Sequence, residues 1–273
     1  MPHDPPVLGA AFNLEHLERH RHWLLAHQRD LELQAFIDPN LLAGDWRAKA
    51  DHARALLDGH RGRLGLHGPF VGFSLDTGDP EVRAVVQRRL EQILDVAAHL
   101  GATQVVLHSP FKTWDRCNLD AVPGARDAMI ARVQATVSPA LRRAEADGVE
   151  LVFENTEDAE PEARVALARS FGSARARVSL DTGHAHYAHV HTGAPPVDFH
   201  VRAAGDWLAH VHLQDTDGWA DRHWVPGEGT ICWPELFRTL AELQSEPRLV
   251  LELRDKDRAP EAAARLAGMG LAR

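Results

Sequence analysis

The stretch between His210 and Trp233 concentrates side chains that can bind a metal ion or transfer a proton. Twelve residues of it hold His212, Asp215, Asp217, Asp221 and His223. His212 lies near the end of the apolar run 208–213, which is typical of a buried strand. Unpaired imidazoles and carboxylates are costly to bury, and a borderline-soft cation such as zinc accepts this mixed set of nitrogen and oxygen ligands. Each residue alone also fits a solvated loop, so a metal site is indicated only if the pattern recurs.

The pattern does recur at the ends of five further apolar runs of three to five residues. These runs end at His67, His108, Glu154, Asp181 and Glu252. His184 follows three positions after Asp181. In every run the side chain that could bind a metal stands at the C-terminal end, which random placement would not produce.

Apolar runs and helical patterns alternate along the whole chain. Strands are predicted at residues 7–12, 31–36, 63–67, 104–108, 150–154, 177–181, 208–213 and 248–252. Helices are predicted at residues 14–28, 45–58, 80–100, 125–147, 159–170, 233–243 and 260–266. Residues 37–44 are expected to form a loop, and 195–197 a short irregular insertion. Strands that alternate with helices predict a parallel sheet.

Eight strands in 273 residues predict an α/β fold, a (β/α)8 TIM barrel that forms a single domain over residues 1–273, because that fold typically occupies about 250 residues. TIM barrels gather their reactive groups at the C-terminal ends of the strands, where the candidate ligands lie. An open doubly wound sheet is the competing arrangement, but residues 9–12 lack the glycine spacing of its phosphate-binding loop.

Composition limits the environment and the partners. No run of about 18 apolar residues and no secretory signal pattern is present, so we expect a cytoplasmic protein without a membrane partner. Cys117 and Cys232 cannot form a disulfide framework. Cys232 follows the Gly227-Glu228-Gly229 turn at a predicted helix start, which favours a structural role.

The candidate residues fall in one order along the chain. That order is His67-Gly-Pro, His108-Ser-Pro, Glu154-Asn-Thr, Asp181-Thr-Gly-His184, His212-Leu-Gln-Asp, Asp221-Arg-His223, Gly227-Glu-Gly and Glu252. It resembles the xylose isomerase-like TIM-barrel superfamily over essentially the whole chain. This superfamily contains sugar and sugar-phosphate isomerases and epimerases, and also the endonuclease IV-type apurinic endonucleases of AP endonuclease family 2.

The resemblance implies two alternative metal sites. Members that are epimerases hold one divalent ion, usually manganese or a similar metal. Their matching ligands here are Glu154, Asp181, His212 and Glu252, with His184 turned toward the substrate. The endonucleases bind three zinc ions through nine ligands. The nine matching positions are His67, His108, Glu154, Asp181, His184, His212, Asp221, His223 and Glu252. The expected cofactor is therefore a divalent metal, either manganese or up to three zinc ions.

The two sites imply different chemistry. In an isomerase or epimerase, Glu154 and Glu252 would be catalytic, one removing a proton next to a carbonyl and the other returning it. In a phosphodiesterase both would be ligands, and clustered zinc ions would lower the pKa of a bound water. A one-metal enzyme has no obvious need for His67, His108 and the other extra ligands, which favours the multinuclear site.

The surface favours the sugar enzyme. DNA binding needs a basic face, whereas 30 Lys and Arg against 39 Asp and Glu give a formal charge of −9. Where the endonucleases insert a Tyr-Leu pair into DNA, this chain has Phe70-Val71, and residues 37–44 contain no arginine or lysine. We therefore expect a metal-dependent isomerase or epimerase of a small sugar or sugar phosphate, with an apurinic endonuclease as the alternative and DNA as the less favoured partner.

Four further residues are candidates for substrate binding. Trp114 could line a sugar pocket or pack on the barrel rim, while Arg222 and Arg254 could clamp a phosphate or pair with Glu228 or Asp255. His184 is the fourth candidate, through the epimerase resemblance. The sequence leaves the substrate, the metal and the oligomeric state undetermined.

Overall fold

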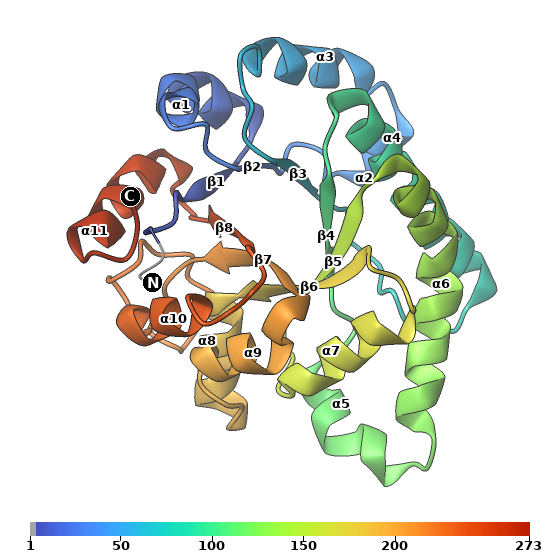
Figure 1. Cartoon of the computed structure of the whole chain (residues 1–273). Coiled ribbons are helices and arrows are strands. Elements are labelled where there is room, and N and C mark those ends of the chain that lie inside the picture. Colours follow the sequence, from blue (N-terminus) through green and yellow to red (C-terminus); the bar gives the residue numbers. More distant parts are fainter. Residues whose placement is uncertain (1–3) are drawn as a thin grey trace.

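Eight parallel strands form a closed barrel in which each strand pairs with its neighbours in sequence and β1 pairs with β8 (Figure 1). The computed structural model describes residues 4–273, apart from the side chains of Arg116 and Cys117, so the prediction for Cys117 lies outside the described part. The strands are β1 (Gly9–Phe12), β2 (Leu31–Leu33), β3 (Leu64–His67), β4 (Gln104–His108), β5 (Glu150–Glu154), β6 (Ala176–Asp181), β7 (Leu208–Leu213) and β8 (Arg248–Leu251).

Helices surround the barrel and connect its strands (Figure 1). The α-helices are α1 (Leu14–Ala26), α2 (Pro39–Ala43), α3 (Arg47–Leu56), α4 (Pro80–Leu100), α5 (Thr113–Asn118), α6 (Ala125–Asp147), α7 (Pro161–Ser170), α8 (Thr182–Thr192), α9 (Val197–Ala204), α10 (Trp233–Leu240) and α11 (Ala259–Gly268). Three short 3-10 helices are η1 (Leu119–Ala121), η2 (Gly205–Trp207) and η3 (Lys256–Arg258). None of the helices between residues 4 and 273 combines the length and apolar composition that crossing a bilayer requires.

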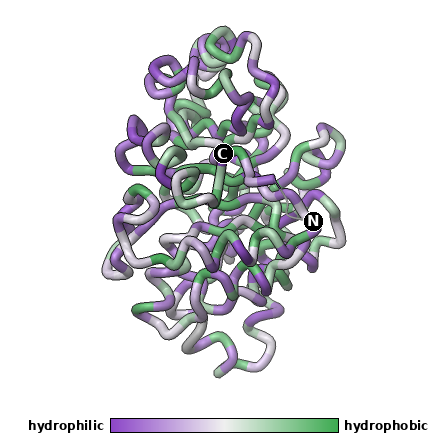
Figure 2. Tube along the Cα trace, turned by 60° about the vertical axis from the view of Figure 1, so that its left-hand side comes forward, coloured by the Kyte–Doolittle hydropathy of each residue, from purple (hydrophilic) through white to green (hydrophobic). Residues whose placement is uncertain are grey.

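The apolar residues of the strands and helices pack together in the layer between the barrel wall and its helices. Val105, Leu107, Leu151 and Phe153 belong to the main core, whose members include helix residues such as Val133. Hydrophobic stretches run through the middle of the molecule, and hydrophilic ones follow the outer helices and loops (Figure 2). Because side chains alternate along a strand, the intervening residues of β4 and β5 point into the barrel.

The interior of the barrel is unusually polar. Branched aliphatic side chains usually fill this space, but here its buried residues include Glu32, Gln104, Ser179, His210 and Arg248. A register shift between β6 and β7 at Val178/Ser179 places Ser179 beside His210 and Asp181 beside His212. As a result, both histidines of β7 point inward.

The predicted TIM barrel is confirmed, while three local predictions are wrong. Residues 37–44 are not only a loop, because Asp38 caps α2 and Pro39 begins it. The crossover from β6 to β7 contains α8 and α9, where no helix was predicted; residues 193–196 between them are irregular. The histidine-rich α8 lacks an apolar stripe, so helical periodicity could not reveal it. The second strand is also shorter than predicted and ends at Leu33.

Asp215 anchors the long loop between β7 and α10. Its Oδ1 accepts hydrogen bonds from the backbone N–H groups of Thr216 (2.9 Å) and Ile231 (3.3 Å). Its Oδ2 accepts from the N–H of Gly227 (2.7 Å) and from Nε1 of Trp233 (2.8 Å). This fully buried carboxylate therefore joins both ends of the loop that carries Asp221 and His223.

The Gly227-Glu228-Gly229 turn closes against this anchor. Gly227 has φ of +89°, a conformation that favours glycine. A Cβ at Gly229 would lie 2.2 Å from the carbonyl oxygen of Thr216, so only glycine fits there. Cys232 lies free at the N-cap of α10, at the predicted helix start.

We predict that Asp215→Asn lowers the free energy of unfolding by about 1–3 kcal/mol, because an amide nitrogen would replace one acceptor and leave buried N–H donors unpaired. Urea unfolding of the metal-free protein measures the change. Asp217→Asn is the matched control in the same loop, because Asp217 is exposed and its ion pair with Arg222 is screened by solvent, so a much smaller change is expected. Equal unfolding midpoints for the two variants would contradict the anchoring role.

Candidate metal centre

Nine side chains that could bind a metal converge at the C-terminal end of the barrel. They are the residues predicted from the sequence: His67, His108, Glu154, Asp181, His184, His212, Asp221, His223 and Glu252. Most stand at or directly after the ends of β3 to β8, and the loop after β7 supplies Asp221 and His223. Their ligand atoms form three groups, and within each group all the ligand atoms lie within 4.8 Å of one another.

The central group consists of Glu154, Asp181, His212 and Glu252. Nδ1 of His212 lies 2.9 Å from Glu154 Oε1, 3.3 Å from Glu252 Oε2 and 3.9 Å from Asp181 Oδ2. All four residues are buried. Three carboxylates and an imidazole nitrogen that face one point form a ligand set suited to a divalent cation.

Two flanking groups lie on either side of the central one. In the first, the Nε2 atoms of His67 and His108 lie 3.5 Å and 3.7 Å from Glu154 Oε2. In the second, Oδ1 of Asp221 lies 3.6 Å from His184 Nε2 and 3.0 Å from His223 Nε2. Glu154 thus turns one oxygen toward the central group and the other toward a flanking group.

Two buried carboxylate oxygens support occupation by a cation. Glu154 Oε2 and Asp181 Oδ2 are buried without a hydrogen-bond partner. A buried anionic oxygen without a donor is costly, and a bound cation would compensate for it. The residues therefore fit a divalent metal.

Neighbouring side chains hold the ligands in place. Nε2 of Gln214 donates to Asp181 Oδ1 and Asp221 Oδ1, both at 3.1 Å, and its Oε1 accepts from the backbone N–H of His223. Asn155 accepts from the N–H of Asp181 at 2.8 Å. His223 has φ of +51°, which few non-glycine residues adopt. The backbone strain at His223 directs its ring toward Asp221.

Burial and the clustered carboxylates shift the pKa values of the ligands. Burial raises the pKa of Asp181 to about 6 and lowers that of His108 to about 4. Burial opposes the charged form of His223, but its hydrogen bond with Asp221 and the nearby carboxylates raise its pKa to about 9. Burial likewise disfavours charge on His184 and His212, yet adjacent carboxylates raise both pKa values well above the usual range. Protons on these histidines therefore balance the carboxylates when no cation does.

The remaining predicted site residues lie on the rim. Trp114 is 75% exposed on α5. Arg222 pairs with Asp217 at 3.0 Å, while Arg254 donates to the backbone carbonyls of Asp221 and Arg222. Neither arginine adopts the expected pairing with Glu228 or Asp255, and Glu228 instead pairs with Arg258. Roles for these residues in substrate binding stay predictions.

Four residues around the centre were not predicted as site residues: Glu32, Gln34, His210 and Lys256. Glu32 contacts His212 and His210 from inside the barrel. Gln34 donates to Glu32 Oε1 (3.1 Å) and to Glu252, and it accepts a hydrogen bond from Lys256 (2.6 Å). A signal for Glu32 was available, because a charged residue between Leu31 and Leu33 in a buried strand requires a partner.

Comparison with known proteins assigns the chain to a family. Residues 30–270 match the xylose isomerase-like TIM barrel family, and the chain belongs to it. An uncharacterised protein of Methanocaldococcus jannaschii is 22% identical over 200 residues, which cover 69% of this chain and 63% of that protein. Fructoselysine 3-epimerase of Escherichia coli O157:H7 is 38% identical over 60 residues, or 22% of each protein. The chain thus aligns with less than two thirds of these relatives.

Solved structures add similar proteins that align over most of both chains. A protein from Thermus thermophilus, solved after soaking with zinc chloride, is 29% identical, with a TM-score of 0.73 over 97% of this chain and 99% of that one. D-psicose 3-epimerase, solved in the presence of D-fructose, has a TM-score of 0.68 and 18% identity over 90% of this chain and 85% of its own. At that identity the similarity shows the fold alone.

We predict that zinc binding at pH 7 releases protons and becomes tighter toward pH 9. The carboxylates around His223, among them Glu252 and Asp181 of the central group, raise its pKa to about 9, so its ring is protonated at pH 7. A cation bound to those carboxylates would repel this proton and release it. As the pH rises through 9, fewer His223 rings are protonated and the proton competes less with the cation. Calorimetric zinc titrations in two buffers with different ionisation enthalpies measure the protons released.

His223→Gln is the control, and it should release fewer protons than the unaltered protein. Identical heats in the two buffers for the unaltered protein would show that no proton leaves and would contradict this prediction.

Proposed function

We propose that this protein is a divalent-metal-dependent isomerase or epimerase that acts on a small sugar or sugar phosphate. The observation that carries the proposal is the central group, in which two buried glutamates, Glu154 and Glu252, flank His212 and Asp181. Glu154 ends β5 and Glu252 follows β8, so the two carboxylates reach the site from separate parts of the barrel wall.

The two glutamates are suited to proton transfer at a carbon next to a carbonyl. A divalent ion bound by the central group would polarise the substrate carbonyl and stabilise the developing negative charge. Burial opposes ionisation of Glu154, but the neighbouring His212, which hydrogen-bonds Oε1, and the rings of His67 and His108 beside Oε2 hold its pKa well below the usual range, so it is ionised at neutral pH. Gln34 donates to Glu252 and fixes its orientation. One glutamate would remove the proton and the other return it.

The comparisons support this class of reaction. The chain shares a 60-residue segment with fructoselysine 3-epimerase at 38% identity. The formal charge of −9 suits a small neutral substrate better than a long polyanion. Either manganese or zinc suits the carboxylate-rich central group, because metal availability as well as affinity decides occupancy.

We predict that Glu154→Gln and Glu252→Gln each lower turnover by about 10²–10⁴-fold, since an amide cannot carry the proton. Ketohexoses and their phosphates are incubated with the metal-loaded protein in D₂O, and NMR follows exchange of the C–H next to the carbonyl. Glu162→Gln, which alters an exposed residue of α7, is the matched control and should retain full exchange. Exchange that persists in both site variants would rule out proton transfer by these glutamates.

A zinc-dependent phosphoesterase, including an apurinic endonuclease, is the second candidate. The observation that favours it is that each flanking group contains three side chains that could bind a metal. The first group is His67, His108 and Glu154, and the second is His184, Asp221 and His223. Three clustered cations would stabilise phosphate charge and lower the pKa of a bound water. Both glutamates would then be occupied as ligands.

We predict one tightly held divalent ion per chain and no cleavage of duplex DNA that carries a single abasic site. Metal content is measured on protein purified without chelators, and nicking is assayed with zinc-loaded protein at concentrations below that of the DNA. Three zinc ions per chain together with multiple-turnover nicking would replace the isomerase with the second candidate.

A further inference from the structure

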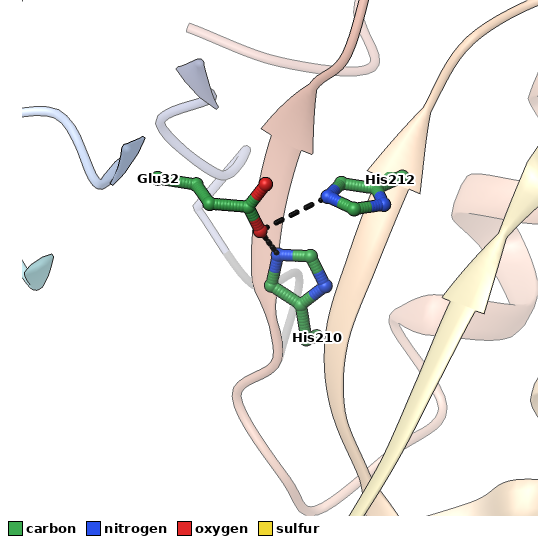
Figure 3. A group of neighbouring side chains, drawn as sticks. All are labelled: Glu32, His210 and His212. Carbon is green, nitrogen blue, oxygen red and sulfur yellow. Dashed lines mark hydrogen bonds and ion pairs between the residues drawn. The ribbon is translucent and has the colours of Figure 1, made fainter. Parts of the chain in front are cut away.

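Glu32 is a buried carboxylate for which the proposed reaction has no use. It occupies the middle of β2, between Leu31 and Leu33, and only 2% of it is exposed. Its carboxylate points toward His210 and His212 of β7 (Figure 3). An apolar side chain at this inward position would avoid the cost of desolvating a charge, which is several kcal/mol. The residue therefore calls for a functional explanation.

Glu32 contacts the ring nitrogen of His212 that is turned away from the central group. Nε2 of His212 lies 3.0 Å from Glu32 Oε2 (Figure 3). Nδ1 of the same ring faces Glu154, Asp181 and Glu252. A neutral imidazole carries one N–H and one free acceptor nitrogen. If the N–H is at Nε2, where Glu32 accepts it, Nδ1 keeps its lone pair for a cation.

His210 and Gln34 contact Glu32 as well. Nε2 of His210 lies 3.3 Å from the same Oε2, and Nδ1 of His210 lies 2.9 Å from the hydroxyl of Ser179. If the hydroxyl donates to Nδ1, the remaining proton of His210 is on Nε2, the nitrogen that lies beside Glu32. The other oxygen of Glu32 accepts from Gln34 at 3.1 Å. Oε2 of Glu32 thus contacts the two histidines of β7, and Oε1 accepts from Gln34, which follows β2.

We propose that Glu32 is a positioning residue for the metal centre, which holds His212 in the Nε2–H tautomer with Nδ1 directed at the metal. This inference rests on the proposed metal-dependent function. A metal-binding histidine carries its N–H on the ring nitrogen that does not bind the metal. A carboxylate that accepts this N–H fixes the orientation of the ring and increases its basicity, and loss of the carboxylate typically weakens metal binding by about 10–100-fold. A cation held by Glu32, His210 and His212 is the competing explanation, since these atoms also lie within 4.8 Å of one another. It would need ions at both nitrogens of His212 and therefore the loss of a second proton from the ring.

The test compares zinc affinity in three proteins, measured by competition with a chromophoric chelator. Glu32→Gln is expected to bind zinc about 10–100-fold more weakly than the unaltered protein. Glu150→Gln is the matched control, because Glu150 begins β5 at the opposite end of the barrel and accepts a hydrogen bond from Gln104. It should leave zinc affinity unchanged.

Two readouts separate positioning from a purely structural role. The visible spectrum of the cobalt-substituted protein should change in Glu32→Gln but not in Glu150→Gln, because only the former alters the ligand geometry. ¹⁵N NMR of the unaltered zinc-loaded protein should show the Nε2–H tautomer of His212. If Glu32→Gln does not fold, two measurements still test the positioning role. One is the tautomer of His212 in the unaltered protein, and the other is the zinc affinity of His210→Gln, which is expected to fall several-fold.

The outcomes distinguish this inference from the proposed function. Absence of zinc and manganese binding by the unaltered protein would overturn the proposed function and this inference with it. Equal zinc affinity of the unaltered protein and Glu32→Gln, or an Nδ1–H tautomer, would overturn this inference alone. Loss of one whole metal equivalent in Glu32→Gln, with the other affinities unchanged, would make Glu32 a ligand and also overturn the positioning role.

Discussion

The burial of carboxylates inside the barrel is the constraint on which the rest of this structure depends. Glu32, Glu154, Asp181 and Glu252 are each less than 10% exposed, and such charges are stable only when they are paired or bind a cation. His212 connects three of them, with one ring nitrogen facing Glu154 and Glu252 and the other facing Glu32. The bulge between β6 and β7 makes this possible, because it aligns His212 with Asp181. Local backbone geometry and the electrostatics of the centre are therefore interdependent.

Much of the barrel and of the ligand set could be predicted because both leave periodic traces in the sequence. A buried parallel strand is a short apolar run, and a TIM barrel presents its reactive groups at the ends of those runs. His108 and Glu154 mark the observed ends of β4 and β5, and α4 begins and ends where the pattern predicts, at Pro80 and Leu100. Proximity in space then follows from the closed order of the strands, without knowledge of any side-chain contact.

The features that could not be predicted depend on contacts between residues far apart in the chain. Glu32 and His212 are 180 positions apart, and Lys256 meets Gln34 across 222. No spacing rule connects such residues. Asp215 was grouped with the potential ligands by its neighbourhood, yet its four hydrogen bonds make it the anchor of the loop after β7. Helix α8 was missed because it has no apolar stripe: it supplies His184 to the site and packs against α9 mainly through small residues.

The choice between the two candidate chemistries reduces to the state of one residue. Oε1 of Glu154 faces the central group, and its Oε2 faces His67 and His108. When a cation occupies only the central group, Oε2 stays free of metal and can accept a proton from a substrate carbon. If His67, His108 and Glu154 held a second cation, Oε2 would be needed as a ligand, and Glu154 could no longer act as a base. The same nine side chains are thus compatible with proton transfer or with phosphate hydrolysis, and under the proposed function metal occupancy beside Glu154 would determine which of the two reactions is possible.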